Sequence, residues 1–118
     1  MSFDVDLLNK KGELCTIKET ITEWGTYKVG GTNFCELNIT YNYSKFYYWF
    51  INKKDGLSWL QDKKAKDTIK QLKSAIKKLG VNPREDSYRA PTPWNAWKAL
   101  SILLKFAEEN PEWVRRVY

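Results

Sequence analysis

The sequence contains no histidine and only two cysteines, Cys15 and Cys35, among its 118 residues. Histidine is the commonest general base and the commonest transition-metal ligand in proteins, so its absence removes both uses at once. Two thiols without histidine also exclude a structural zinc site with four protein ligands. We therefore expect neither a metal ion nor a cofactor.

Groups that could carry catalysis are equally scarce. Gly30-Gly31 is not followed by the Lys-Ser/Thr of a phosphate-binding loop. Glu108 and Glu109 are neighbours in sequence and would diverge on a helix, so they do not form an acid–base pair. A cysteine or hydroxyl nucleophile would have no histidine to activate it. The sequence thus predicts a protein that is not an enzyme, with no catalytic residues.

Long apolar stretches are absent too. No run approaches the roughly 20 residues of a membrane-spanning helix, and the N-terminus lacks the apolar core of a signal peptide. We expect a cytoplasmic protein without membrane contact, folded as a single domain over residues 1–118. Both thiols should then be reduced, although neighbouring strands would bring them close enough for a disulfide.

Aromatic and basic residues are abundant and unevenly placed. Seven of the ten residues 41–50 are aromatic, more than one face of a helix or strand can bury. The net charge of +6 is concentrated in residues 45–90, which hold twelve Lys or Arg and five acidic residues. A local positive field favours anionic partners. The alternative is that these lysines simply form solvated helix faces.

The order of patterns along the chain predicts an α+β fold. Period-two alternation, turn residues and helical periodicity indicate the order β-β-β-α-α-α-β, an antiparallel sheet of about four strands with helices packed on one face. The first two strands should form a hairpin around the turn at 9–12. The expected elements are strands at 3–7, 13–21, 34–41 and 112–118, helices at 44–52, 63–79 and 93–109, and a short packed segment at 57–60.

Several residues should fix these boundaries. Ser44 is expected to be the N-cap of the aromatic helix, and Gly80 should end the long helix. Thr92 should cap the last helix, with Pro93 at its first position.

Side-chain directions follow from the same periodicities. In the aromatic helix Tyr48 should be the exposed ring, because Phe46, Tyr47, Trp49 and Phe50 share about half of the circumference. In the last strand Arg115 and Arg116 should point to opposite faces, with Asp4 and Asp6 as partners if the first and last strands pair.

Two sets of residues are candidate binding sites. The first set is a row of lysines at helical spacing: Lys63, Lys66, Lys70, Lys73 and Lys77. Such a row could contact the phosphates of a nucleic acid without sequence specificity. The alternative is that it forms an ordinary solvated helix face. The second set joins rings that could stack on a base with arginines and amides that could bind phosphate or base edges: Tyr41, Asn42, Tyr43, Ser44, Tyr48, Arg84, Tyr88, Arg89, Trp94 and Asn95. Alternatively Asn42 and Ser44 only cap the helix, while Trp94 and Trp97 fill the core.

Three features of residues 39–118 form a recognisable pattern: a T-Y-N-x-S motif at Thr40–Ser44, a lysine-rich helix after Gly56-Leu57, and a tryptophan segment leading to the C-terminal Glu109-Asn110-Pro111. In these features the chain resembles a family of short bacterial and phage proteins of unknown function. This chain departs from the family pattern in Thr92-Pro93-Trp94-Asn95-Ala96-Trp97 and in its many rings after Ser44. The resemblance implies a phage or mobile-element protein in the host cytoplasm, an anti-defence candidate.

We therefore expect a small binding protein that recognises a phosphate-bearing, nucleotide-like ligand or a host protein through an aromatic and basic surface. One alternative is an accessory protein that binds nucleic acid without sequence specificity. Another is a protein-interaction module that self-assembles as a homo-oligomer through its exposed rings.

Overall fold

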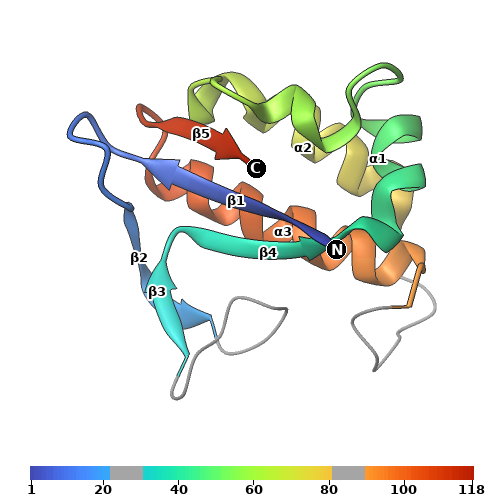
Figure 1. Cartoon of the computed structure of the whole chain (residues 1–118), viewed down its shortest axis with the longest axis horizontal. Helices are drawn as coiled ribbons and strands as arrows, with labels where there is room; N and C mark the ends of the chain where they lie inside the picture. The colour runs from blue at the N-terminus through green and yellow to red at the C-terminus, as the bar shows by residue number, and fades with distance from the viewer. Residues whose placement is uncertain (22–30, 81–89) are drawn as a thin grey trace.

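A computed structural model of the chain describes residues 1–21, 31–80 and 90–118 (Figure 1). The fold is α+β, as the sequence pattern predicts. Its strands are β1 (Ser2–Leu8), β2 (Thr16–Ile21), β3 (Thr32–Phe34), β4 (Glu36–Thr40) and β5 (Val114–Val117). Its helices are α1 (Ser44–Phe50), α2 (Ala65–Leu79) and α3 (Pro93–Glu109), with 3-10 turns η1 (Tyr41–Tyr43) and η2 (Gly56–Leu60).

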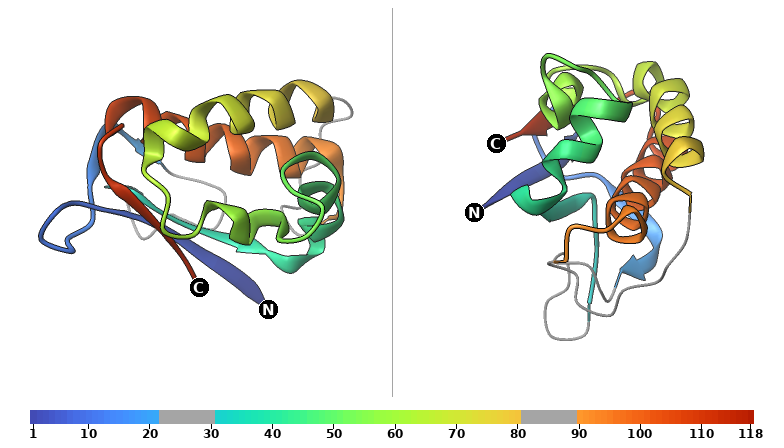
Figure 2. Two further views of the ribbon diagram at one scale, coloured as in Figure 1. Left: turned by 90° about the horizontal axis from the view of Figure 1, so that it is seen from above. Right: turned by 90° about the vertical axis from the view of Figure 1, so that its right-hand side faces the viewer.

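The main sheet has the antiparallel order β4-β1-β5. Val5 of β1 lies opposite Leu37 of β4 and Val117 of β5, so these three side chains share one face. Helices α2 and α3 run side by side on that face (Figure 2). Val5, Leu7 and Leu37 are consequently buried in one hydrophobic cluster with the helices.

Among the described residues, no helix is long and apolar enough to cross a membrane.

The predicted pairing of the first two strands is wrong. Both edges of β1 are occupied by β4 and β5, whereas β2 pairs with β3 in a separate two-stranded sheet. The expected hairpin is present only next to the turn, as the bridge between Leu8 and Leu14 and the hydrogen bonds from Asn9 N to Glu13 O and from Cys15 N to Leu7 O, and it does not extend into β2. A turn brings two segments together, but it does not decide which of them keeps the central position in the sheet.

A junction of three hydrogen bonds connects the two sheets. Leu7 N donates to Cys35 O at 2.9 Å, Cys35 N to Cys15 O at 2.8 Å, and Cys15 N to Leu7 O at 2.9 Å. All three residues are buried. Cys35 therefore splits the predicted strand at 34–41 into β3 and β4, which belong to different sheets. Both cysteines are free thiols.

The predicted end of α2 and the predicted start of α3 are confirmed, whereas α2 begins at Ala65 and not at Lys63. Gly80 ends α2 with a φ of 69°, a conformation that glycine adopts without strain. Thr92 caps α3 by accepting a hydrogen bond from Asn95 N at 3.3 Å, and Pro93 is the first helical residue. At α1 the prediction differs from the structure, because Ser44 is the first helical residue and Tyr43 occupies the N-cap position.

The last strand separates its two arginines as predicted. Arg116 lies opposite Asp6 on the face of the sheet away from the helices, and its guanidinium is 3.6 Å from the Asp6 carboxylate. Arg115 points into the core and is completely buried. Its Nε donates to Thr68 Oγ1 at 3.1 Å and its Nη2 to Leu103 O at 2.9 Å. Among the described residues no acidic side chain pairs with Arg115.

Candidate binding surface

One face of η1 and α1 presents three exposed rings. The exposed fractions are 41% for Tyr41, 44% for Tyr48 and 61% for Trp49. Lys45 is also exposed and lies among them in sequence. Positions 41, 45, 48 and 49 recur at spacings that place side chains on one side of a helix. We call these four residues the aromatic face of α1.

The opposite side of α1 attaches the helix to the core. Tyr43, Phe46, Tyr47 and Ile51 are buried there. The rings of Tyr43 and Tyr47 meet edge to face, with centroids 6.4 Å apart. The Tyr47 hydroxyl donates to Ala96 O of α3 at 3.3 Å, and complete burial raises the pKa of that hydroxyl well above its usual value. These contacts fix the rotation of α1 and leave the aromatic face exposed, and the helix itself lies at one end of the molecule (Figure 1).

Tyr48 is supported from behind by Gly56. A Cβ on Gly56 would lie 3.3 Å from each of three consecutive ring atoms of Tyr48, which places it over the ring centre. The glycine backbone therefore covers one face of this ring, in a conformation with φ of 57° that other residues rarely adopt. Asn52 holds the turn, because its side-chain oxygen accepts Lys54 N and Asp55 N while its carbonyl accepts Gly56 N.

Trp49 is the most exposed ring of the segment, and this corrects one sequence-based expectation. The exposure of Tyr48 is confirmed, but Trp49 does not join the buried half of the helix. The buried arc is centred on Tyr43 and Tyr47, and a helical wheel drawn from these two places Trp49 on the outer side. Its ring meets the rings of Phe46 and Phe50 edge to face, with centroid distances of 5.9 and 6.3 Å.

The surroundings of the aromatic face are mainly basic. Lys45 projects over the Phe46 ring at 5.1 Å from its centroid. Lys53 and Lys54 lie in the turn after α1 and are exposed, with Asp55 the acidic residue of the same turn. Lys45 and Lys53 lie four residues to either side of Trp49. Exposed rings bordered by cations are suited to a partner surface that carries negative charge.

The second predicted set of ligand-binding residues is only partly brought together. Tyr43 and Asn95 are buried, so in this structure neither contacts a ligand at the surface. Asn95 Nδ2 instead donates to Ala90 O at 2.9 Å and holds the entry to α3. Asn42 is exposed, Ser44 is half-buried, and Trp94 stacks at 4.8 Å on Trp97, both half-buried. The predicted residues Arg84, Tyr88 and Arg89 lie outside the described residues.

The predicted lysine row of α2 is engaged within the protein at three of its five positions. Lys63 donates to Trp59 O and lies 4.4 Å from the centre of that ring. Lys66 pairs with Glu112 at 3.3 Å, and Lys73 lies 3.9 Å from Glu108. Only Lys70 and Lys77 are exposed without an ion pair to another described residue. Lys66 and Lys73 thus each lie beside a carboxylate, which offsets part of the positive charge of the row.

Groups with catalytic or metal-binding potential are few in the described part of the chain. Burial raises the pKa of both thiols, and for Cys35 the pKa reaches about 12. A thiol with such a pKa is a poor nucleophile at neutral pH, because it is almost entirely protonated. Residues 1–21, 31–80 and 90–118 contain no group of three acidic or thiol side chains placed to hold a metal ion.

Comparisons of the chain with protein-family models, with curated proteins and with solved structures found no match. The resemblance to short phage-type proteins therefore stays a prediction. What supports a function is accordingly the chemistry of the molecule's own surface.

Proposed function

We propose that this protein is a non-enzymatic binding protein that recognises an acidic surface of a partner protein through the aromatic face of α1. The observation that carries the proposal is the 61% exposure of Trp49 beside Tyr41 and Tyr48 on one rigidly attached helix face. Tryptophan and tyrosine are enriched among the residues that dominate interface energy. Contiguous exposed rings of this kind are typical of interaction sites.

The partner's acidic character is inferred from the lysines around the rings. Lys45, Lys53 and Lys54 would be brought close to the bound surface, and complementary charge speeds association and selects against wrong partners. A small phosphate-bearing ligand is less well supported at this face. Such ligands are usually enclosed in concave pockets, whereas these rings stand on the outer side of a helix.

Two chemical features support the non-enzymatic part of the proposal. The sequence has no histidine to act as a general base. Burial raises the pKa of Cys35 to about 12, which makes this thiol a poor nucleophile at neutral pH.

Single-stranded nucleic acid is a second candidate partner, favoured by Tyr48. One face of this ring rests on Gly56 and the residue remains 44% exposed, so a base could stack on the outer face. Stacking on aromatic rings combined with nearby lysines is how many proteins bind single strands without reading sequence.

Photo-crosslinking from the aromatic face tests the proposal. Benzoylphenylalanine would replace Trp49, and in a second sample Phe34, which is 44% exposed on β3 and serves as the matched control. Illumination in a lysate of the cells that carry the gene should give a discrete adduct with another protein from position 49 alone. Lys45→Glu should weaken that adduct several-fold.

The alternatives give different products in the same experiment. A nuclease-sensitive adduct would favour the nucleic-acid candidate, and an adduct of twice the 13.9 kDa chain mass would indicate self-assembly. Equal crosslinking from positions 49 and 34, or none from either, would contradict the proposal that α1 carries the contact.

A further inference from the structure

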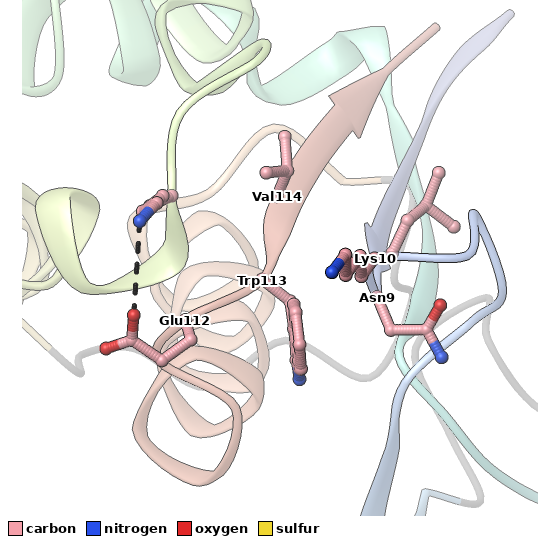
Figure 3. A pocket seen from close by; sticks show the side chains of 7 residues that line it. Asn9, Lys10, Glu112, Trp113 and Val114 are labelled. Carbon is pink, nitrogen blue, oxygen red and sulfur yellow. Dashed lines mark ion pairs between the residues drawn. The ribbon is translucent and has the colours of Figure 1, made fainter.

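A groove lies at the other end of the molecule from α1, between the turn after β1 and the start of β5 (Figures 1 and 3). Its volume is about 480 Å³, within the range of small-molecule sites. Leu8, Trp113 and Val114 form its apolar part, and Lys10, Lys64 and Glu112 stand around it (Figure 3). None of these residues belongs to the aromatic face of α1.

The groove is held by backbone pairing and needs no rearrangement to form. Val114 lies opposite Leu8 in the sheet and is bridged on its other side by Lys64. The neighbouring carbonyl of Trp113 accepts Ala65 N at 2.7 Å. Because Arg115 points into the core, Val114 and Leu8 point to the face of the sheet that the helices leave uncovered.

The charge around the groove is positive. Glu112 is shared by two lysines, Lys66 at 3.3 Å and Lys64 at 4.0 Å, and the shorter contact is to the lysine that does not line the groove. Lys10 is exposed and has no ion pair with any other described residue. Apolar side chains with two incompletely neutralised ammonium groups are complementary to an apolar molecule that carries one anionic group.

We propose that this groove binds a small amphipathic anion. The apolar body of the ligand would rest on Leu8, Trp113 and Val114, and its carboxylate, sulfonate or phosphate would face Lys10 and Lys64. This site is independent of the proposed partner-binding face, so either proposal can fail without the other.

A titration with 8-anilinonaphthalene-1-sulfonate tests the site, because this probe joins an apolar ring system to one sulfonate. The folded protein should bind the probe saturably at one site, and the indole N–H signal of Trp113 should shift in two-dimensional NMR spectra. Lys10→Glu should weaken binding about tenfold, since it replaces a charge-assisted contact by repulsion.

Lys11→Glu is the matched control. Lys11 lies in the same exposed turn and its replacement changes the net charge equally, but it does not line the groove. Binding should stay within about twofold in this variant and in Trp49→Ala. Absence of saturable binding, equal loss in the two lysine variants, or loss in Trp49→Ala would overturn the proposal.

Discussion

Replacing Arg115 by methionine should leave the protein about as stable as it is now, although Arg115 is one of its most buried side chains. Desolvation in the core lowers the pKa of the guanidinium to about 10. The shift from 12.5 corresponds to a cost of about 3 kcal/mol for keeping the charge in the folded protein. No carboxylate among the described residues offsets that cost.

Two hydrogen bonds act in the opposite direction. The bonds from Arg115 to Thr68 Oγ1 and to Leu103 O should each contribute about 1.5 kcal/mol, the lower value for charged donors. Nη1 is buried without a partner among the described residues, so no hydrogen bond offsets its share of the desolvation cost. The contributions nearly cancel. Methionine reaches as far without a charge, and replacing buried ions by apolar residues is often neutral or stabilising.

Urea unfolding at pH 7, followed by circular dichroism, measures these differences. Arg115→Met should change the free energy of unfolding by less than about 1 kcal/mol, whereas Arg115→Ala should lower it by about 2–5 kcal/mol because a cavity remains. A loss above about 2 kcal/mol in Arg115→Met, similar to that in Arg115→Ala, would refute the reasoning, since the guanidinium itself would then stabilise the fold.

A double-mutant cycle with Thr68→Val separates the hydrogen bond from packing. In the natural protein this change leaves the buried Arg115 Nε without an acceptor and should cost about 1–3 kcal/mol. In the Arg115→Met background it should cost less than about 0.5 kcal/mol, because Thr68 then bonds only to Ala65 O of its own helix. Equal costs in both backgrounds would show that the two side chains do not interact.

Three shorter predictions concern other parts of the core and the α1 surface. Gly56→Ala should lower the free energy of unfolding, measured in urea, by about 1–2 kcal/mol, because the new Cβ would press against the Tyr48 ring and the positive φ at this position strains alanine. Adding Tyr48→Ala should recover only the part of this loss that comes from the clash with the ring. Tyr47→Phe removes the bond to Ala96 O and should cost about 1 kcal/mol in the same assay. Iodoacetamide at pH 8 should alkylate Cys35 about a thousandfold more slowly in the folded than in the unfolded protein, because the raised pKa keeps the thiol protonated. The alkylation rate should rise with pH. A rate equal to that of a free thiol would contradict this prediction.

The sequence predicted those parts of the fold that local chemistry determines. Thr92 and Pro93 start α3, and Gly80 ends α2, because caps and positive φ angles depend on a few adjacent residues. The opposite directions of Arg115 and Arg116 follow from the period of a strand.

Strand partners were not predictable in the same way. Phe3 to Leu7 alternates as any half-buried strand does, and that alternation fits an edge and a central position equally well. β1 is the central strand because it pairs with β4 on one side and β5 on the other, and these strands lie about 30 and 110 residues further along the chain. Cys35, which divides β3 from β4, is neither glycine nor proline and gives no local sign of a break.

The candidate surface depended on a rotation that the sequence left open. The sequence indicated that the rings of residues 41–50 must divide between core and surface, but the tertiary contacts of Tyr43, Phe46 and Tyr47 set which side faces out. Lysine spacing likewise predicted a basic row on α2, yet its partners Glu108 and Glu112 come from α3 and the segment before β5. Ion pairs of this kind, between residues of different elements, follow only from the tertiary structure.

The rings of η1 and α1 divide into those that attach the helix to the core and those that are exposed. Tyr43 and Tyr47 attach the helix to the fold, whereas the ring pairs of Trp49 among the described residues are with Phe46 and Phe50 of its own helix. Removing an exposed side chain of this kind changes stability little. Trp49→Ala should therefore weaken the proposed partner contact while Tyr43 and Tyr47 keep α1 attached to the fold.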